Sequence, residues 1–558
     1  MTHPGVARNK QCPARLLPNS PTDRFRIPAS NSRIESRTAL PLEPTGALVS
    51  DKTLPDTRSA QRATTATATA TTATPTIQSD EETRLAARNK LVIGILLVSA
   101  FIVILNETIM SVALPRLMED LDIPAESAQW LTTAFMLTMA VVIPITGFLL
   151  QRFNTRPVFI AAMTFFSIGT FVAAMAPGFE VLLIARVIQA CGTAIMMPLL
   201  MTTVMTLVPA SSRGRTMGNI SIVISVAPAI GPTISGLILS VLDWRWMFWL
   251  VLPIALAGLI VGALRIPNVT TPRKAPFDVL SVILSVFGFG GLVYGLTTIG
   301  GANAMSWMPV WGPLVVGLVA LGLFVLRQLQ LQRTDRALLD LRTFLSKNFT
   351  LSIVMFAISM MALFGTLILL PLYLQNVLRL DTLSTGLLLL PGGLVMGVLA
   401  PFVGRIYDKR GPMVLLVPGA IIVSAVLWSL TMVTSTTPVP LILTAHIVLS
   451  VGLALMFTPL FTASLGSLKP ALYSHGSAVV GTVQQVAGAA GTAVFVTLMS
   501  SRAASLVATG SDPILAQTDG IRAAFLVGAI VSLGAVAVAF FVRKPVDQPG
   551  GAPAPMGH

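Results

Sequence analysis

From Leu91 onward, the chain alternates between long apolar stretches and short polar segments. Each apolar stretch has about 20 residues or more, which is long enough to cross roughly 30 Å of hydrocarbon as a helix. We expect fourteen spans, at residues 91–114, 127–149, 157–177, 181–207, 216–240, 246–266, 278–298, 309–327, 350–376, 384–403, 413–433, 440–464, 477–499 and 521–541. Their apolar residues are continuous rather than alternating, so a transmembrane β-barrel is excluded. The pattern predicts an all-α polytopic membrane protein.

The segment before the first span is different. Residues 1–88 are rich in Pro, Ser, Thr and Arg, and contain no apolar stretch that could form a core. We therefore predict a disordered tail there. Over all 558 residues, 54% are hydrophobic and only 11% charged, which excludes a soluble multidomain protein.

The charges of the loops predict the orientation. If the N-terminus is cytoplasmic, the loops after even-numbered spans hold 16 Lys and Arg residues and the loops after odd-numbered spans hold five. Such an excess is typical of cytoplasmic loops, so we expect both termini to be cytoplasmic. The formal net charge of +14 comes from these loops and the tail, and we expect no nucleic-acid partner.

The chain also repeats itself. "GFLLQRFNTRP" (Gly147–Pro157) follows the second span, and "GRIYDKRGP" (Gly404–Pro412) follows the tenth. "RVIQACGTA" (Arg186–Ala194) in the fourth span aligns with "HIVLSVGLA" (His446–Ala454) in the twelfth. Two halves related in this way around a central site are typical of transporters.

The repeat predicts the domain organisation. We expect two related six-helix bundles with the seventh and eighth spans inserted between them. The segments are a tail (1–88), a first bundle (89–266), two inserted helices with a cytoplasmic loop (267–348), a second bundle (349–542) and a C-terminal tail (543–558).

With this organisation and these motifs, the chain resembles the major facilitator superfamily, and within it the fourteen-span drug:proton antiporters of EmrB/QacA type. The resemblance covers Leu91 to Val542. It implies a major facilitator fold, in which two bundles rock around a midplane cavity.

The family's cytoplasmic gating motif follows the second span. Its first copy here keeps Gly147 and Arg152 but has Gln151 in place of the acid and Asn154 in place of a glycine. A short turn bearing a carboxylate and arginines can join two helix ends by an ion pair that opens as the bundles rock. The alternative for this copy is an ordinary basic loop.

The second copy of the gating motif, after the tenth span, is more complete. It retains Gly404, Asp408, Arg410 and Gly411. We expect these residues to form the cytoplasmic gate, with an ordinary basic loop again as the alternative.

The first span carries a carboxylate in "LNETIMSVALP" (Leu105–Pro115), where the family acid is replaced by Asn106 and Glu107 follows. One residue is a rotation of about 100° on a helix. Arg186 in the fourth span lies at a similar depth, roughly 8–10 Å from the outer boundary. Ionisable residues inside a span are costly and indicate function. We expect Glu107 to exchange the proton and Arg186 to be its partner; a purely structural ion pair is the alternative.

His446 occupies the position of Arg186 in the second half. Histidine titrates near neutral pH, so His446 could relay protons. The alternative is a neutral histidine that hydrogen-bonds two helices. The second-half counterpart of Glu107 is Leu363, which confines membrane carboxylates to the first half.

The fifth span contains "APAIGPTISG", which resembles the family's antiporter motif. Its small residues allow close helix approach, and its proline bends the span. The motif residues are Ala227, Gly231, Pro232 and Gly236. The resemblance implies export rather than uptake; generic helix packing is the alternative.

Together these features predict a proton-coupled multidrug efflux transporter of the cell membrane, which exports lipophilic or cationic small molecules and is not an enzyme. Alternatives are a dedicated exporter of one natural product or lipid intermediate, proton-coupled uptake, and a non-transporting membrane sensor or enzyme. The sequence contains no HExxH, CxxC or GxxxxGK[ST] motif, and we expect no cofactor or metal. The expected partners are the substrate, protons and the lipid bilayer; the sequence identifies no protein partner.

Overall fold

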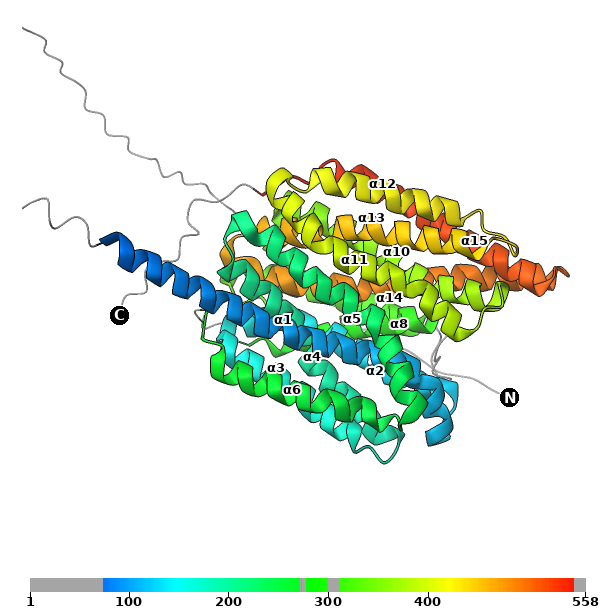
Figure 1. Ribbon diagram of the computed structural model, residues 1–558, viewed down its shortest axis with the longest axis horizontal. Helices are drawn as coiled ribbons and strands as arrows, with labels where there is room; N and C mark the ends of the chain where they lie inside the picture. The colour runs from blue at the N-terminus through cyan, green and yellow to red at the C-terminus, as the bar shows by residue number, and fades with distance from the viewer. Residues whose placement is uncertain (1–73, 271, 273–276, 300–310, 546–558) are drawn as a thin grey trace, which may run out of the picture. The chain divides into compact units, whose positions relative to one another are not determined.

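The computed structural model describes residues 74–270, 272, 277–299 and 311–545 (Figure 1). These residues form helices joined by turns, and none of them lies in a strand. The helices are α1 (Thr74–Leu121), α2 (Ala125–Arg152), α3 (Thr155–Ala174), α4 (Phe179–Leu207), α5 (Arg213–Val241), α6 (Arg245–Arg265), α7 (Val279–Ser285), α8 (Gly291–Ile299), α9 (Gly312–Leu331), α10 (Lys347–Leu372), α11 (Thr382–Arg410), α12 (Met413–Leu430), α13 (Val439–Gly466), α14 (Tyr473–Ala508) and α15 (Pro513–Ala539).

Within the described residues, fourteen helical segments are long and apolar enough to cross a membrane, which confirms the predicted number of spans. Two of the described spans contain a π-helical turn. In one of them, η2 (Val286–Gly290) joins α7 to α8, and in the other, η5 (Tyr373–Val377) extends α10.

The first helix is longer than its apolar stretch. Helix α1 begins at Thr74 and therefore extends into residues 74–88, which we expected to belong to the tail. Residues 80–90, "DEETRLAARNK", are mainly good helix formers, and this propensity allows the helix to continue beyond the apolar span. The rest of the predicted tail, 1–73, and residues 546–558 lie outside the described residues.

Three helix pairs of the first half have an equivalent pair in the second half. Helix α4 packs against α2 and α3, and α3 also packs against α6. The equivalent contacts in the second half join α13 to α11 and α12, and α12 to α15. The repeated sequence thus forms two repeated bundles, α1–α6 and α10–α15.

The two bundles meet mainly along two helix pairs, α5 with α11 and α2 with α14. We call the helix ends that carry Arg152, Arg213 and Lys409 the basic face, and the opposite ends the distal face. A hydrogen bond also crosses between the bundles in the basic half, from the Thr458 hydroxyl to Ser221 at 2.9 Å.

Small residues let α5 and α11 approach closely from the basic face to about halfway along both helices. A methyl group at Gly218 would lie 2.5 Å from the carbonyl oxygen of Ala400, and one at Gly397 would lie 2.5 Å from the Val226 side chain. Toward the distal face, a methyl group at Gly236 or at Gly386 would meet no atom within 4 Å. The bundles are therefore packed tightly at the basic face and less closely near the distal face.

The inserted pair, α7–α8 and α9, packs as a hairpin beside α2 and α14. Helices α8 and α9 of this hairpin are in close backbone contact at Gly291 and Gly317. At the distal end, Trp130 of α2 stacks on Tyr294 of α8 with ring centroids 5.6 Å apart.

Candidate transport site

Arg186 is the central charged residue of the first bundle. It lies on α4 and is fully buried, with its guanidinium 4.0 Å from the centroid of the Phe135 ring on α2. Its Nη1 donates to the side-chain oxygen of Gln189 at 2.5 Å and to that of Asn106 on α1 at 3.3 Å. Arg186 therefore joins α1, α2 and α4 inside the bundle.

A second polar residue continues this cluster to α3. Gln189 is fully buried one turn after Arg186, and its Nε2 donates to the Thr170 hydroxyl at 2.8 Å. Thr170 in turn donates to the backbone carbonyl of Phe166 at 2.7 Å. Gln189 thus connects the guanidinium to a fourth helix, and both the oxygen and the nitrogen of its amide are hydrogen-bonded.

The guanidinium itself is only partly satisfied. The Nε and Nη2 atoms of Arg186 are buried and donate to none of the described residues. A buried donor without an acceptor costs about 1–3 kcal/mol, and more when it is charged. Arg186 therefore retains two donor atoms that could each donate a hydrogen bond to a further acceptor.

Glu107 follows Asn106 on α1. Because successive residues of a helix are rotated by about 100°, the two side chains have different surroundings. Asn106 is 2% exposed and bonds Arg186, whereas Glu107 is partly exposed. The Glu107 carboxylate makes no hydrogen bond to the described residues, and it attracts the Arg186 guanidinium from beyond ion-pair distance. The residue in direct contact with Arg186 is thus Asn106 rather than the expected Glu107.

The antiporter motif lies against the residue after Glu107. A side chain at Gly231 of α5 would collide with Thr108 of α1, and the Thr108 hydroxyl is 3.5 Å from the carbonyl oxygen of Ala227. Helix α5 continues without a break through Pro232. Gly236, the last residue of the motif, has open space around it. The part of the motif in contact with α1 is therefore Ala227 to Gly231.

At the basic face, Asp408 of α11 binds the beginning of α5. Its two carboxylate oxygens accept hydrogen bonds from the backbone N–H groups of Gly214 and Arg215, each at 2.8 Å. The first N–H groups of a helix have no partner within the helix, and a negative charge there is favourable. We call these two bonds between α11 and α5 the latch.

The other residues of the second motif copy support this geometry. Gly404 faces the backbone of Gly214 so closely that a side chain would collide with it. Gly411 ends α11 with a φ of +79°, a conformation that favours glycine, and its N–H bonds the Tyr407 carbonyl. Arg410 is exposed on the basic face.

The first motif copy occupies the equivalent position between α2 and α14, with different chemistry. Gln151 donates through Nε2 to the carbonyl oxygen of Ala471 at 2.9 Å, whereas Asp408 accepts. Gly147 allows His475 of α14 to lie against α2. Arg152 is exposed at the end of α2.

His446 lies between α13 and α11, away from any described carboxylate partner. Its Nε2 lies 3.1 Å from the carbonyl oxygen of Leu389, and Gly392 leaves room for the ring. The Nδ1 atom is buried and has no partner among the described residues. This arrangement hydrogen-bonds two helices of the second bundle.

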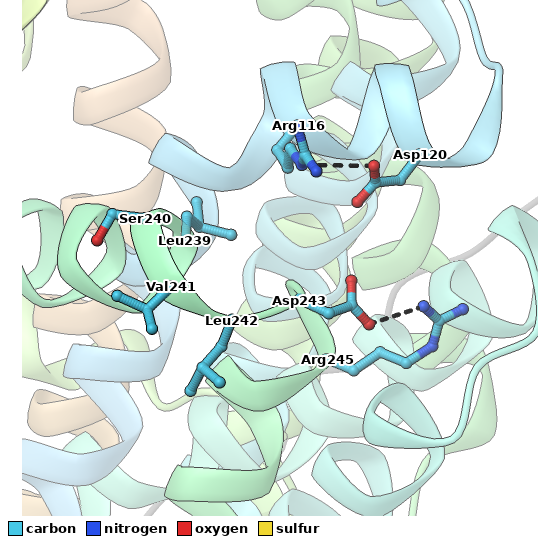
Figure 2. A pocket seen from close by; sticks show the side chains of 8 residues that line it. All are labelled: Arg116, Asp120, Leu239, Ser240, Val241, Leu242, Asp243 and Arg245. Atoms are coloured by element: carbon cyan, nitrogen blue, oxygen red, sulfur yellow. Dashed lines mark hydrogen bonds and ion pairs between the residues drawn. The ribbon is translucent and has the colours of Figure 1, made fainter.

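A pocket of about 580 Å³ opens at the distal face, between the end of α1 and the turn that joins α5 to α6 (Figure 2). Two ion pairs line it. Arg116 and Asp120 of α1 lie 3.4 Å apart, and Arg245 and Asp243 lie 3.0 Å apart on the other side. Arg116 follows Glu107 by nine residues, roughly 13 Å along the same helix.

No group of three or more His, Cys, Asp and Glu side chains suitable for a metal occurs in the part of the chain that the structure describes.

Residues 96–492 match the family model of the Major Facilitator Superfamily. The chain belongs to the Major Facilitator Superfamily. It is accordingly a multi-pass transporter of the cell membrane and not an enzyme.

Several relatives of this facilitator are named as resistance proteins. It is 42% identical over 458 residues to the lincomycin resistance protein LmrB of Listeria innocua, covering 81% of this chain and 96% of that protein. It is 40% identical to LmrB of Bacillus subtilis, covering 80% and 95%. It is 27% identical to the multidrug resistance protein B homolog of Mycobacterium tuberculosis, covering 73% and 75%.

Solved structures support the fold. The human organic anion transporter MFSD10 superposes with a TM-score of 0.57 at 14% identity, covering 81% of this facilitator and 99% of that chain. The proton:xylose symporter XylE superposes with a TM-score of 0.54 at 14% identity, covering 80% and 95%.

Three parts of the site were not predicted from the sequence. The bridging role of Gln189 could have been inferred from its place three residues after Arg186, which puts both on one helix face. The use of Asn106 in place of the acid was detectable only as a departure from the motif. One ion pair of the distal pocket lies on α1 and the other lies where α5 turns into α6, and no local pattern connects them.

Proposed function

We propose that this facilitator is a proton-coupled efflux transporter that exchanges external protons for lipophilic or cationic compounds from the cytoplasm. One observation carries the proposal: a carboxylate, Glu107, lies in a membrane helix near the buried, incompletely satisfied guanidinium of Arg186. Membrane carboxylates of this kind are expensive and are characteristic of proton pathways.

The proton step follows from the charges. When Glu107 is ionised, it attracts Arg186, and after a small movement of α1 its carboxylate oxygens can accept hydrogen bonds from the two free donor atoms of the guanidinium. When Glu107 takes a proton, this attraction is lost and Arg186 keeps only Asn106 and Gln189. Protonation therefore changes how strongly α1 is held to α4.

The antiporter motif provides a way to transmit this change. Thr108, next to Glu107, is in close contact with Gly231 of α5, so a shift of α1 displaces α5. The opposite end of α5 is the end held by Asp408. Proton binding near the distal end of α5 is thereby coupled to the latch at its other end.

The pocket at the distal face would serve as the aqueous approach to this site. The excess of basic residues in its loops supports a cytoplasmic orientation of the basic face, and the distal face is then external. Its paired Arg and Asp side chains keep the pocket polar between the external solution and α1. A closed latch with a less closely packed distal half is the arrangement in which an antiporter loads its external proton.

The substrate class is supported by the relatives. Lincomycin is the first compound to test because it is named in two relatives that are 40–42% identical. A dedicated exporter of a single compound is the second candidate, favoured if lincomycin alone is transported. No specific observation favours uptake.

The test is accumulation of lincomycin and of a panel of lipophilic cationic dyes in an efflux-deficient host. We expect cells with the wild-type protein to accumulate less, and this difference to vanish with a protonophore, with Glu107→Gln and with Arg186→Ala. Glu180→Gln is the matched control, since this carboxylate is exposed at the start of α4.

Protonophore-sensitive export that survives Glu107→Gln would contradict the proposed proton site and direct attention to His446. Export unaffected by the protonophore would contradict proton coupling itself. Membrane levels of each variant, measured by immunoblot, separate loss of transport from loss of protein.

A further inference from the structure

The segment after α15 crosses the basic face of the second bundle. Val542 is fully buried, and the N–H of Arg543 donates to the side-chain oxygen of Asn348 on α10 at 2.9 Å. Pro545 lies against Gly466 at the end of α13, where an added methyl group would be 3.3 Å from the proline ring. Residues Val542–Pro545, here called the strap, therefore connect α15 with α10 and α13.

The strap also reaches the end of α11. The Lys544 ammonium donates to the backbone carbonyl of Asp408 at 2.8 Å, and its positive charge attracts the Asp408 carboxylate. The stem of Lys544 lies beside Gly411, where an added methyl group would be 3.3 Å from the Lys544 Cβ. Lys544 thus binds the residue whose carboxylate forms the latch.

We propose that Lys544 is a positioning residue of the transport cycle: it fixes the last turn of α11 so that Asp408 meets the first N–H groups of α5. The last carbonyl groups of a helix have no partner within the helix, and a cation beside them is favourable. Lys544 supplies both the hydrogen bond and the charge at this one turn.

Lys544 therefore affects the balance between two states of the transporter, one with the latch closed and one with the bundles parted at the basic face. Both latch bonds depend on the position of the Asp408 carboxylate, with each oxygen 2.8 Å from one N–H of α5. Loss of Lys544 releases the end of α11 and so weakens the latch. The bundles then part more often at the basic face.

This inference rests on the latch role proposed for Asp408, and its test is designed to separate the two claims. Ser221 of α5 is buried against Thr458 of the second bundle and becomes accessible from the basic face only when the bundles part. A Ser221→Cys reporter, in the full-length chain lacking Cys12 and Cys191, is labelled with a membrane-impermeant maleimide in inverted membrane vesicles.

We expect Lys544→Ala to raise the labelling rate by about two- to five-fold, the range expected for one cation at a helix C-terminus. Lys544→Arg should restore the wild-type rate because it keeps the charge and the donor. Arg543→Ala is the matched control: it removes the neighbouring exposed charge, while the backbone bond of Arg543 to Asn348 remains.

Asp408→Asn distinguishes the possible failures. If Asp408→Asn raises labelling and Lys544→Ala does not, the latch stands and the role of Lys544 is wrong. If neither variant changes labelling, both claims are wrong. An equal rise with Arg543→Ala would also overturn the inference, because it would show a general effect of charge at the basic face.

Discussion

At the scale of single residues, the site depends on polar atoms that share one buried guanidinium. Arg186 holds Asn106 and Gln189 directly, and Glu107 acts on it only through charge. Because the apolar interior offers no water to replace a missing partner, each of these side chains has a measurable energetic role.

The first prediction concerns Gln189. Gln189→Leu should lower the free energy of unfolding by about 1–3 kcal/mol, because the shortest hydrogen bond of Arg186 is lost and the Thr170 hydroxyl loses its donor. Thermal unfolding in detergent measures the change. Thr193→Val is the control, since that hydroxyl bonds only the carbonyl of its own helix. Equal stability of Gln189→Leu and wild type would contradict the role of the cluster.

The second prediction compares two glycines of one motif. Gly231→Ala should abolish most transport, because its methyl group would collide with Thr108 and force α1 away from α5. Gly236→Ala should transport almost as well as wild type because that position is open. Drug accumulation measures both. Similar losses in the two variants would show that the motif acts by helix flexibility rather than by this contact.

At the scale of helices, the inserted pair is held together at the basic face by a half-buried ion pair and by buried polar side chains. The Asp278 carboxylate lies 3.0 Å from Arg327 of α9 and also caps α7 at the Ser281 N–H. Gln328, fully buried, donates to the Ser281 hydroxyl and accepts from the backbone N–H groups of Leu338 and Leu339. The loop that follows α9 is thus anchored to the hairpin.

The third prediction follows from the charge of Asp278. The hydrogen bond from Arg327 is the main cause that lowers the pKa of Asp278 below its usual value of 3.8. A lowered carboxyl pKa contributes stability that is present above the ordinary pKa and is lost as the pH falls through the folded pKa. Asp278→Asn should therefore cost about 0.5–1 kcal/mol at pH 7 and progressively less toward pH 3.

Thermal unfolding across this pH range checks the prediction. Asparagine is also a good helix cap, so the substitution removes mainly the charge. Asp519→Asn, which breaks an exposed pair with Arg522, should have a smaller effect. A cost for Asp278→Asn that stays constant from pH 7 to pH 3 would contradict the ion pair.

At the scale of the whole molecule, the apolar spans were readable from the sequence because a membrane helix needs about 20 consecutive apolar residues. The number of spans and the superfamily are confirmed. The extension of α1 to Thr74 was not predicted, since that part of the helix depends on propensity rather than on an apolar stretch.

The site was less predictable than the fold. Depth along the helices placed Arg186 and Glu107 at one level, but depth carries no information on rotation, and it is Asn106 that faces the guanidinium. Likewise, Asp408 was recognisable as a motif residue, whereas its partners on α5 lie 194 and 193 residues away in sequence. The strap and the distal pocket have no local signature at all.

The central claim is that proton exchange at Glu107 drives transport. The most direct test is proton release from the purified protein in weakly buffered solution, measured with a pH-sensitive dye when a substrate identified by the accumulation assay is added. We predict release by the wild type and none by Glu107→Gln, with the control Glu180→Gln behaving as wild type. Release that persists unchanged in Glu107→Gln would contradict the account.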